Sequence, residues 1–443
     1  MRSYREVLAI REVWTTILLS ALTRLPIFGL TMLITLHVVE TLGMSYRLAG
    51  AVTTFVTISS MISAPWRSMT DRRGLRRTMI PSIVVMTAVY AVAPWLGYYP
   101  LLVILALGYL WNYPIYTIPR QVLIATVPLR KRRAALSLDA VSIEICYMFG
   151  PMVSIIIASS VGTRATMIGC AVLAAIGATG LTVLDPPIAE TSGAASEGQT
   201  PGSSSPDGNP SPDPRPATEP VAPTQSSATE ALAVEGTARD PDAPTIDVPT
   251  AHPSTTSALA WVNRFTVAIL IGCLAAGYTL GGIELTTVGA MREMGSTQAI
   301  GWVLAFSGLG SALGGTIYGA LNRSVPMPVL LTLMGLTATA TTLATSPLQA
   351  GLILLIGGLF VSPTLTASID QLTSLTPPSR RGSVIGWQGS FLNAGVAISA
   401  PTIGAVIDGV GWHQAFILSG AVAAVIGLAV GAVMRTRSRR SFP

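Results

Sequence analysis

Charged side chains inside long apolar stretches are the residues of this sequence that are best placed to do chemistry. Arg24 lies about ten residues into the apolar run 13–39, and Glu144 lies about ten residues into the run 134–160. If both runs are membrane-crossing helices, a rise of 1.5 Å per residue puts both side chains about 15 Å from the same boundary, near the bilayer midplane. An ionised side chain at that depth costs about 3 kcal/mol or more unless it is paired, so such residues are functional candidates.

Glu144 and Arg24 are matched in depth, which suggests that they form a pair. An isolated glutamate in an apolar bundle is neutral, whereas a nearby arginine keeps it ionised. A conformational change that separates the two side chains would draw a proton onto the carboxylate. We therefore interpret Glu144 as a proton-coupling carboxylate with Arg24 as its counterion; the alternative is a fixed structural ion pair.

The other charged residues inside the runs are weaker candidates for a functional role. Arg120 and Asp139 lie near the same ends of adjoining antiparallel runs, where a structural ion pair is the favoured interpretation. Asp370 occupies the position in the second half that Arg120 occupies in the first, and Glu284 lies near the far end of its run. Asp139, Glu284 and Asp370 compete with Glu144 for the coupling role. Polar and aromatic side chains that could line a cavity are Trp111, Asn112 and Asn393.

The sequence carries no sign of enzyme or metal chemistry. The three cysteines, Cys146, Cys170 and Cys273, lie inside apolar runs and have no metal-ligand spacing. It contains no His-Glu-x-x-His motif, nucleophile elbow or phosphate-binding loop. We therefore expect neither enzyme activity nor a bound metal or cofactor. His37, near the end of the first run, is expected to reach out to the membrane interface; the alternative is a pH-sensitive gate partner.

The elements that must position these residues are long and apolar. Of the 443 residues 50% are hydrophobic and 11% are charged, and the mean hydropathy is +0.58, whereas a soluble domain has about 25% charged residues. Runs of about 20 apolar residues predict membrane-spanning helices, so the fold class is an all-α integral membrane protein. Six spans are predicted near 13–39, 46–66, 78–98, 100–127, 134–160 and 164–184, and six more near 261–290, 297–321, 326–345, 347–376, 383–407 and 412–434.

The segment 185–258 between the two sets has a different composition. It holds 14 of the 31 prolines and 11 of the 21 acidic residues, and it has no aromatic residue. Such a segment cannot bury enough apolar surface to offset its ordering entropy, so we predict a disordered linker. The chain then divides into an N-terminal six-helix bundle over 1–184 and a C-terminal six-helix bundle over 259–443.

The basic residues predict the orientation in the membrane. Twenty of them fall on the side of both termini, against three on the opposite side, Arg47, Arg164 and Arg292. Both termini and the linker are therefore expected in the cytoplasm, and the bilayer rather than a nucleic acid accounts for the basic clusters. The single lysine, Lys131, among so many arginines is typical of GC-rich bacterial genomes, which favours a bacterial inner membrane. We expect a monomer.

The two halves also repeat each other. At an offset of 250 residues Gln121 meets Gln371, Arg130 meets Arg380 and Pro151 meets Pro401. The matches fall in order, each at an equivalent point of its half. Two six-helix repeats of the same orientation suggest a transporter with a binding site at the interface of the repeats.

The loop after the second run carries a motif. Its sequence, 71–77, reads Asp-Arg-Arg-Gly-Leu-Arg-Arg and resembles the loop 2–3 signature of the major facilitator superfamily, although Arg67 stands where the leading glycine of that signature is expected. The resemblance implies a cytoplasmic gate formed by Asp71, Arg72, Gly74, Arg76 and Arg77. The alternative for the arginines is that they enforce topology and bind anionic lipid headgroups.

A second partial match concerns the fifth run. Gly150 and Pro151 are similar to the Gly-Pro of the superfamily's antiporter motif, although Ile155 replaces one of its glycines. This resemblance implies export, and we predict proton-coupled efflux of a small amphipathic organic compound or drug. Two alternatives stay open: an importer or uniporter of a sugar-like or anionic metabolite, with Arg24 as anion anchor, and a membrane receptor or scaffold that does not transport.

Overall fold

The computed structural model describes residue 7 and residues 9–63, 75–113, 117–127, 129–184, 262–321, 325–377 and 380–438. Every element in these ranges is helical, and none is a strand. The predicted linker 185–258 lies outside the described residues, as do the gate residues Asp71, Arg72 and Gly74.

The first half consists of helices that follow the predicted runs closely. They are α2 (Arg11–Leu36) with its π-helical extension η1 (His37–Thr41), α3 (Tyr46–Ile62), α6 (Leu75–Val92), α7 (Tyr98–Gly108), α8 (Thr117–Thr126), α9 (Leu129–Val161) and α10 (Thr163–Leu184).

The second half repeats this plan. Its helices are α11 (Arg264–Glu293), α12 (Ala299–Ala320), α13 (Met327–Ala340), α14 (Pro347–Gly358), α15 (Val361–Ser374), α16 (Arg381–Val410) and α17 (Trp412–Ser438). Eight stretches of the described residues are long and apolar enough to cross a membrane, and three shorter apolar helices accompany them. The chain is therefore a multi-pass membrane protein.

Two runs predicted as single helices are interrupted in the structure. The run 100–127 is helical as far as Trp111, three residues before Pro114; Asn112 and Tyr113 are not helical, and the next described helix begins at Thr117. The run 347–376 breaks between Gly358 and Val361, just before Pro363. Proline lacks the N–H that a helix interior needs and clashes with the carbonyl four residues earlier, so both interruptions have a local cause.

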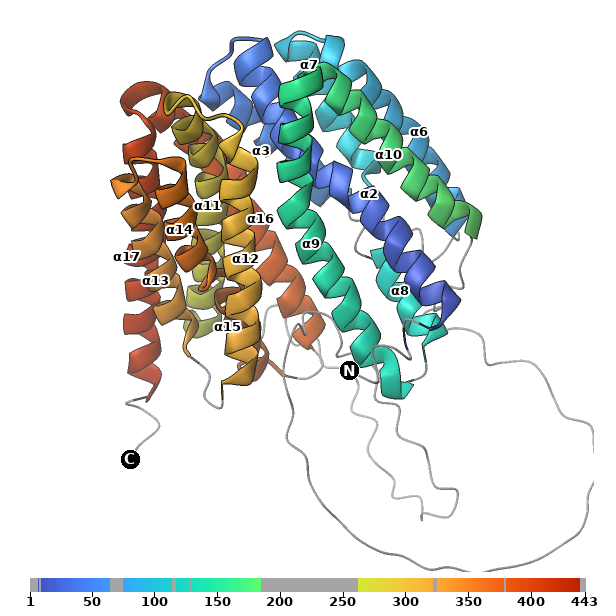
Figure 1. Cartoon of the computed structure of the whole chain (residues 1–443). Coiled ribbons are helices and arrows are strands. Elements are labelled where there is room, and N and C mark those ends of the chain that lie inside the picture. The colour runs from blue at the N-terminus through green and yellow to red at the C-terminus, as the bar shows by residue number, and fades with distance from the viewer. Residues whose placement is uncertain are drawn as a thin grey trace, which may run out of the picture.

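The two halves stand side by side, and their described helices come closest at one end (Figure 1). We call the end at which α2 begins and α17 ends the proximal end, and the opposite end the distal end. At the distal end Thr54 of α3 donates a hydrogen bond to the carbonyl of Ala397 of α16 (2.6 Å). A buried apolar cluster there joins Met32 and Ile155 of the first half to Ile300 and Phe416 of the second.

Toward the proximal end, residues of α3 and α16 are less well covered by the opposite half. On α3 the later residues Phe55 and Ile62 are 47% and 62% exposed, whereas Ala49 and Val52 of its first turns are buried. On α16, Asn393 is exposed, whereas Ala397 and Ala400 are buried. As far as the described residues show, the halves thus enclose a cleft that is closed distally and open proximally.

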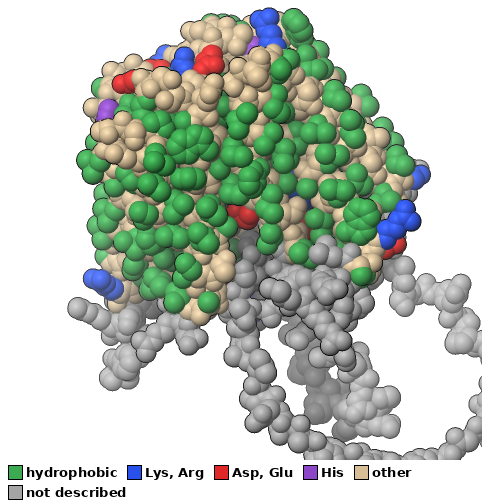
Figure 2. Space-filling view, viewed as in Figure 1, with side chains coloured by type: hydrophobic (Ala, Val, Ile, Leu, Met, Phe, Trp, Pro, Cys, Tyr) green, Lys and Arg blue, Asp and Glu red, His purple; other side chains and the backbone are tan. Residues whose placement is uncertain are grey.

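The surface has the chemistry of a protein in a bilayer. Figure 2 shows hydrophobic side chains over the middle of the visible face, while charged side chains lie mostly at its upper and lower margins. Lipid tails can solvate such a belt, whereas water cannot do so favourably over this area.

Candidate functional site

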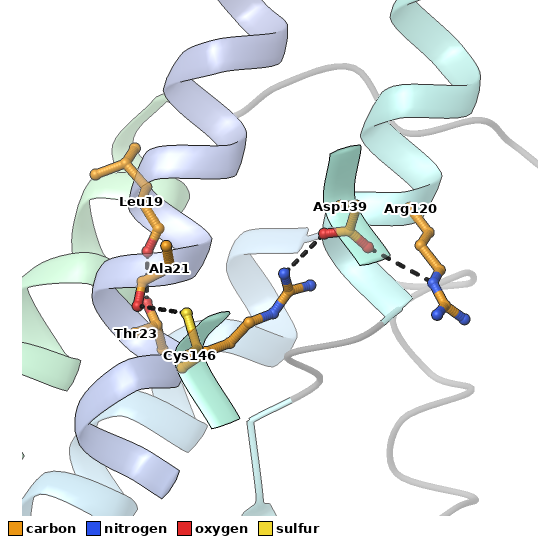
Figure 3. A network of polar contacts seen from close by, with 7 residues as sticks. Leu19, Ala21, Thr23, Arg120, Asp139 and Cys146 are labelled. Atoms are coloured by element: carbon orange, nitrogen blue, oxygen red, sulfur yellow. Dashed lines mark hydrogen bonds and ion pairs between the residues drawn. The ribbon is translucent and has the colours of Figure 1, made fainter. Parts of the chain in front are cut away.

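A buried ionic cluster lies within the first half. Arg24 of α2 donates through Nη1 to Oδ1 of Asp139 on α9 at 2.7 Å, and both side chains are 0% exposed. Nε of Arg120, on α8, lies 3.6 Å from Oδ2 of the same carboxylate (Figure 3). The expected contact between Arg120 and Asp139 is therefore present, but Asp139 is shared between two arginines.

Close helix packing fixes this cluster in place. A Cβ added at Gly150 of α9 would lie 2.5 Å from the carbonyl oxygen of Leu25 and 3.0 Å from Cβ of Phe28, so α2 and α9 cross where a larger residue would not fit. Near this crossing the thiol of Cys146 lies 3.7 Å from the carbonyl oxygen of Ala21 (Figure 3). Gly150 thus has a packing role that is independent of any antiporter motif.

The predicted pair of Arg24 and Glu144 is not formed. Arg24 binds Asp139, and Glu144 makes no hydrogen bond or ion pair with any residue that the structure describes. Its side chain is exposed. Depth alone predicted the pair, but Asp139 lies on the face of α9 that packs against α2, and Glu144 does not.

A second polar contact crosses from one half to the other. Tyr147 of α9 donates its hydroxyl hydrogen to Oε1 of Glu284 on α11 at 2.6 Å. The ring of Tyr147 also meets Phe28 of α2 edge to face, with centroids 5.4 Å apart. Tyr147 was not among the residues singled out from the sequence, although its position one turn after Glu144 on the same helix was a signal.

Glu284 belongs to a small cavity between the halves. The cavity has a volume of about 50 Å³, and four helices line it: α2 and α3 from the first half, α11 and α16 from the second. Its polar lining consists of Glu284 and three threonines, Thr31, Thr35 and Thr53. The cavity lies at the closed end of the cleft, at the level of the hydrogen bond from Thr54 to Ala397.

Glu144 and Asn393 are placed along the cleft on the proximal side of this cavity. Residues three and four apart share a helix face, so Glu144 lies one turn proximal of Tyr147 on the same side of α9. Asn393 similarly precedes the cavity residue Val396 on α16 by three residues. Both side chains are exposed. A molecule entering from the proximal end would pass them before reaching Glu284.

The other candidates from the sequence lie elsewhere. Asn112 donates from Nδ2 to Oγ of Ser60 at 3.4 Å within the first half, and its neighbour Trp111 is half-buried. Asp370 is exposed on α15, and its carboxylate forms no hydrogen bond or ion pair with the described residues. Arg76 is exposed near the start of α6, and the side chain of Arg77 lies outside the description.

His37 contradicts its expected position. Its side chain is 0% exposed, and neither ring nitrogen has a hydrogen-bond partner among the described residues. The expectation that His37 reaches the membrane interface is therefore wrong: this residue lies in the π-helical turn η1 and is buried in the protein.

Comparison with known proteins agrees with this architecture. The sequence profile of the Major Facilitator Superfamily matches residues 16–288 and 254–442, and the chain belongs to this family. No curated protein has a significantly similar sequence. The family and the fold are those of secondary transporters that span the membrane many times.

Solved structures of transporters share the fold at low sequence identity. The nucleoside transporter NupG is 14% identical with a TM-score of 0.65, covering 96% of this chain and 99% of that one. The POT family transporter PepTSo is 13% identical with a TM-score of 0.67, covering 97% and 98%. A bacterial homologue of the human lysosomal transporter Spinster, solved in an inward-facing and occupied conformation, is 10% identical with a TM-score of 0.65, covering 96% of each chain.

Proposed function

We propose that this chain exports a small amphipathic organic compound in exchange for protons, by exposing one cleft alternately to the two sides of the membrane. The observation that carries the proposal is the hydrogen bond from Tyr147 to Glu284 at the closed end of the cleft. It joins a titratable group on one half to a donor on the other, so the surroundings of the carboxylate depend on how the halves are arranged. Coupling requires that kind of dependence, because a ligand shifts a conformational equilibrium only through different interactions with its states.

Glu284 takes over the coupling role that the sequence suggested for Glu144. Arg24 is held by Asp139, so Glu144 has no counterion whose release would change its protonation. When the distal contacts open, α9 and α11 move apart and Glu284 loses the tyrosine hydroxyl. The proton is then bound or released at Glu284 according to the side on which the cleft is open.

Glu144 is proposed to meet the substrate. It is an exposed and unpaired carboxylate on the cleft face of α9, one turn from Tyr147 and its edge-to-face partner Phe28. A carboxylate beside aromatic rings favours an amphipathic compound that carries positive charge. An anionic substrate is disfavoured, because Arg24, the residue suggested to bind its negative charge, is fully buried and bound to Asp139.

The proposed orientation of the protein in the membrane rests on the distribution of the basic residues. The proximal end carries most of them, so it is assigned to the cytoplasm of a bacterium, and the described arrangement is the one open to the cytoplasm. Asp71, Arg72, Gly74, Arg76 and Arg77 are proposed to form the gate on that side, and the chain is proposed to act as a monomer.

Transport assays in inverted membrane vesicles test the proposal. Candidate compounds are screened for uptake into vesicles that hold an acidic interior, with and without an agent that collapses the pH gradient. Export coupled to protons predicts accumulation that disappears when the gradient is collapsed. Uptake that only equilibrates the compound, with or without the pH gradient, would favour a uniporter, and binding without any flux would favour a receptor.

A further inference from the structure

At the distal end, where the two halves meet, a carboxylate of the second half binds backbone N–H groups of the first. Asp408, in the last turn of α16, accepts hydrogen bonds from the first two backbone N–H groups of α3. Its Oδ1 lies 2.8 Å from the nitrogen of Tyr46, and its Oδ2 lies 2.8 Å from the nitrogen of Arg47. A carboxylate from the second half thus caps a helix of the first.

The first turn of α3 has no other acceptors for these groups. The initial N–H groups of an α-helix have no partner inside the helix. Ser45, the N-cap, accepts the hydrogen bond of Leu48 through Oγ at 3.3 Å, which leaves the N–H groups of residues 46 and 47 to Asp408. The positive end of the helix dipole also favours a negative charge at this place.

Neighbouring contacts at the same place also join η1 and α11 to α3, and α16 to α3. Arg292, in the last turn of α11, donates through Nη1 to the hydroxyl of Tyr46 at 2.9 Å, and its Nε lies 3.3 Å from Oε1 of Glu40 at the end of η1. Gly404, one turn before Asp408, lies against the backbone of Tyr46 and Arg47, where a Cβ would collide. Asp408 is therefore seated where the backbones of α3 and α16 meet.

We infer that Asp408 is a distal latch, a positioning residue that favours the state in which the cleft is closed at this end. The inference rests on the proposed alternating access, in which α3 and α16 must part distally once in each cycle. On parting, Asp408 exchanges two charge-assisted hydrogen bonds for water, whereas the Ser45 cap stays intact because both of its partners belong to α3. A contact present in one state and absent in the other biases the equilibrium between them.

The test measures the two states directly on purified protein in lipid nanodiscs. Spin labels are placed at Tyr99 and Leu343, which are 78% and 76% exposed at the distal ends of opposite halves, in a chain whose three cysteines are replaced by alanine. Electron–electron double resonance then gives the shares of short and long distances. Asp408→Ala, which removes both acceptor oxygens, should raise the ratio of long to short distances about fivefold, the usual range for loss of a helix cap. Asp408→Arg, which brings a positive charge to the helix N-terminus, should raise it further.

Two controls separate a latch from ordinary helix stabilisation. Ser45→Ala removes a cap of the same helix within one half, and Arg47→Ala removes a side chain while keeping its N–H. Both should leave the ratio within about twofold. The inference is overturned if both Asp408 variants also stay within twofold, or if Ser45→Ala shifts the ratio as much as Asp408→Ala. No substrate is present, so failure of the proposed transport would leave this result unaffected.

Discussion

Asp139 of α9 binds Arg24 of α2 at 2.7 Å with both side chains fully excluded from solvent. Arg120 of α8 approaches the other oxygen of the same carboxylate at 3.6 Å. One acidic side chain therefore ties three helices of the first half together. The ionic cluster belongs to the rigid interior of this half, and the cleft draws its chemistry from other residues.

Removing the carboxylate should destabilise the protein. Asp139→Asn removes the carboxylate that binds the buried Arg24 guanidinium, and breaking a buried pair in this way costs about 3–5 kcal/mol. Thermal unfolding of the purified variant in detergent should show a clear fall in melting temperature. Asp370→Asn, which removes an exposed carboxylate with no ion pair, should stay within about 0.5 kcal/mol of the parent. Equal stability of Asp139→Asn and the parent would show that the pair has no structural role.

Glu144 should discriminate between charged and uncharged ligands. Glu144→Gln keeps the size of the side chain but removes its charge, so the affinity for a cationic substrate should fall about tenfold, which corresponds to about 1.4 kcal/mol. An uncharged analogue of the same compound should lose less than about twofold. Ligand binding to purified protein provides the measurement, with the exposed Glu293→Gln of α11 as control. A similar loss of affinity for both ligands would mean that Glu144 does not discriminate between charged and uncharged ligands.

The segment 185–258 should act as a tether. Deletion of residues 195–245 leaves about 20 linker residues, which span roughly 25 Å as a flexible chain. That length is enough to join the two bundles, so transport by the shortened chain should match the parent at equal expression. Lost transport from a well-expressed and folded deletion variant would instead assign the acidic segment a further role.

The orientation is open to an independent check. Alkaline phosphatase is active only outside the cytoplasm, so a fusion after residue 220, in the linker, should be inactive. A fusion after residue 162, in the distal turn between α9 and α10, should be active and serves as the positive control. The reverse pattern would place the distal end in the cytoplasm.

Much of the helix pattern was predictable from the sequence because a bilayer imposes a simple rule on length and polarity. The run 164–184 lies within α10, and the run 412–434 within α17. The interruptions near Pro114 and Pro363 were missed because apolar periodicity continues across them. Pro363 stands in the first turn of α15, just after the break, whereas Pro26 and Pro151 lie inside continuous helices, so the presence of a proline does not by itself show where a helix ends.

The site was predictable only in part, because a sequence gives the depth of a residue better than the direction in which it points. Glu144 and Asp139 are five residues apart on α9, yet one is exposed and the other is buried against α2. Depth matching therefore chose the wrong partner for Arg24. The contacts of Glu284 with Tyr147, and of Asp408 with α3, join residues that are more than a hundred positions apart, and no local pattern announces them.

The central claim is that Glu284 couples protons to the arrangement of the halves, and uphill transport in proteoliposomes tests it most directly. Purified parent protein should concentrate a transported compound against its gradient when a pH gradient is imposed. Glu284→Gln should only equilibrate the compound, Tyr147→Phe should still concentrate it but about tenfold more slowly, and Glu293→Gln should behave as the parent. If Glu284→Gln concentrates the compound under the pH gradient as well as the parent does, the account is contradicted.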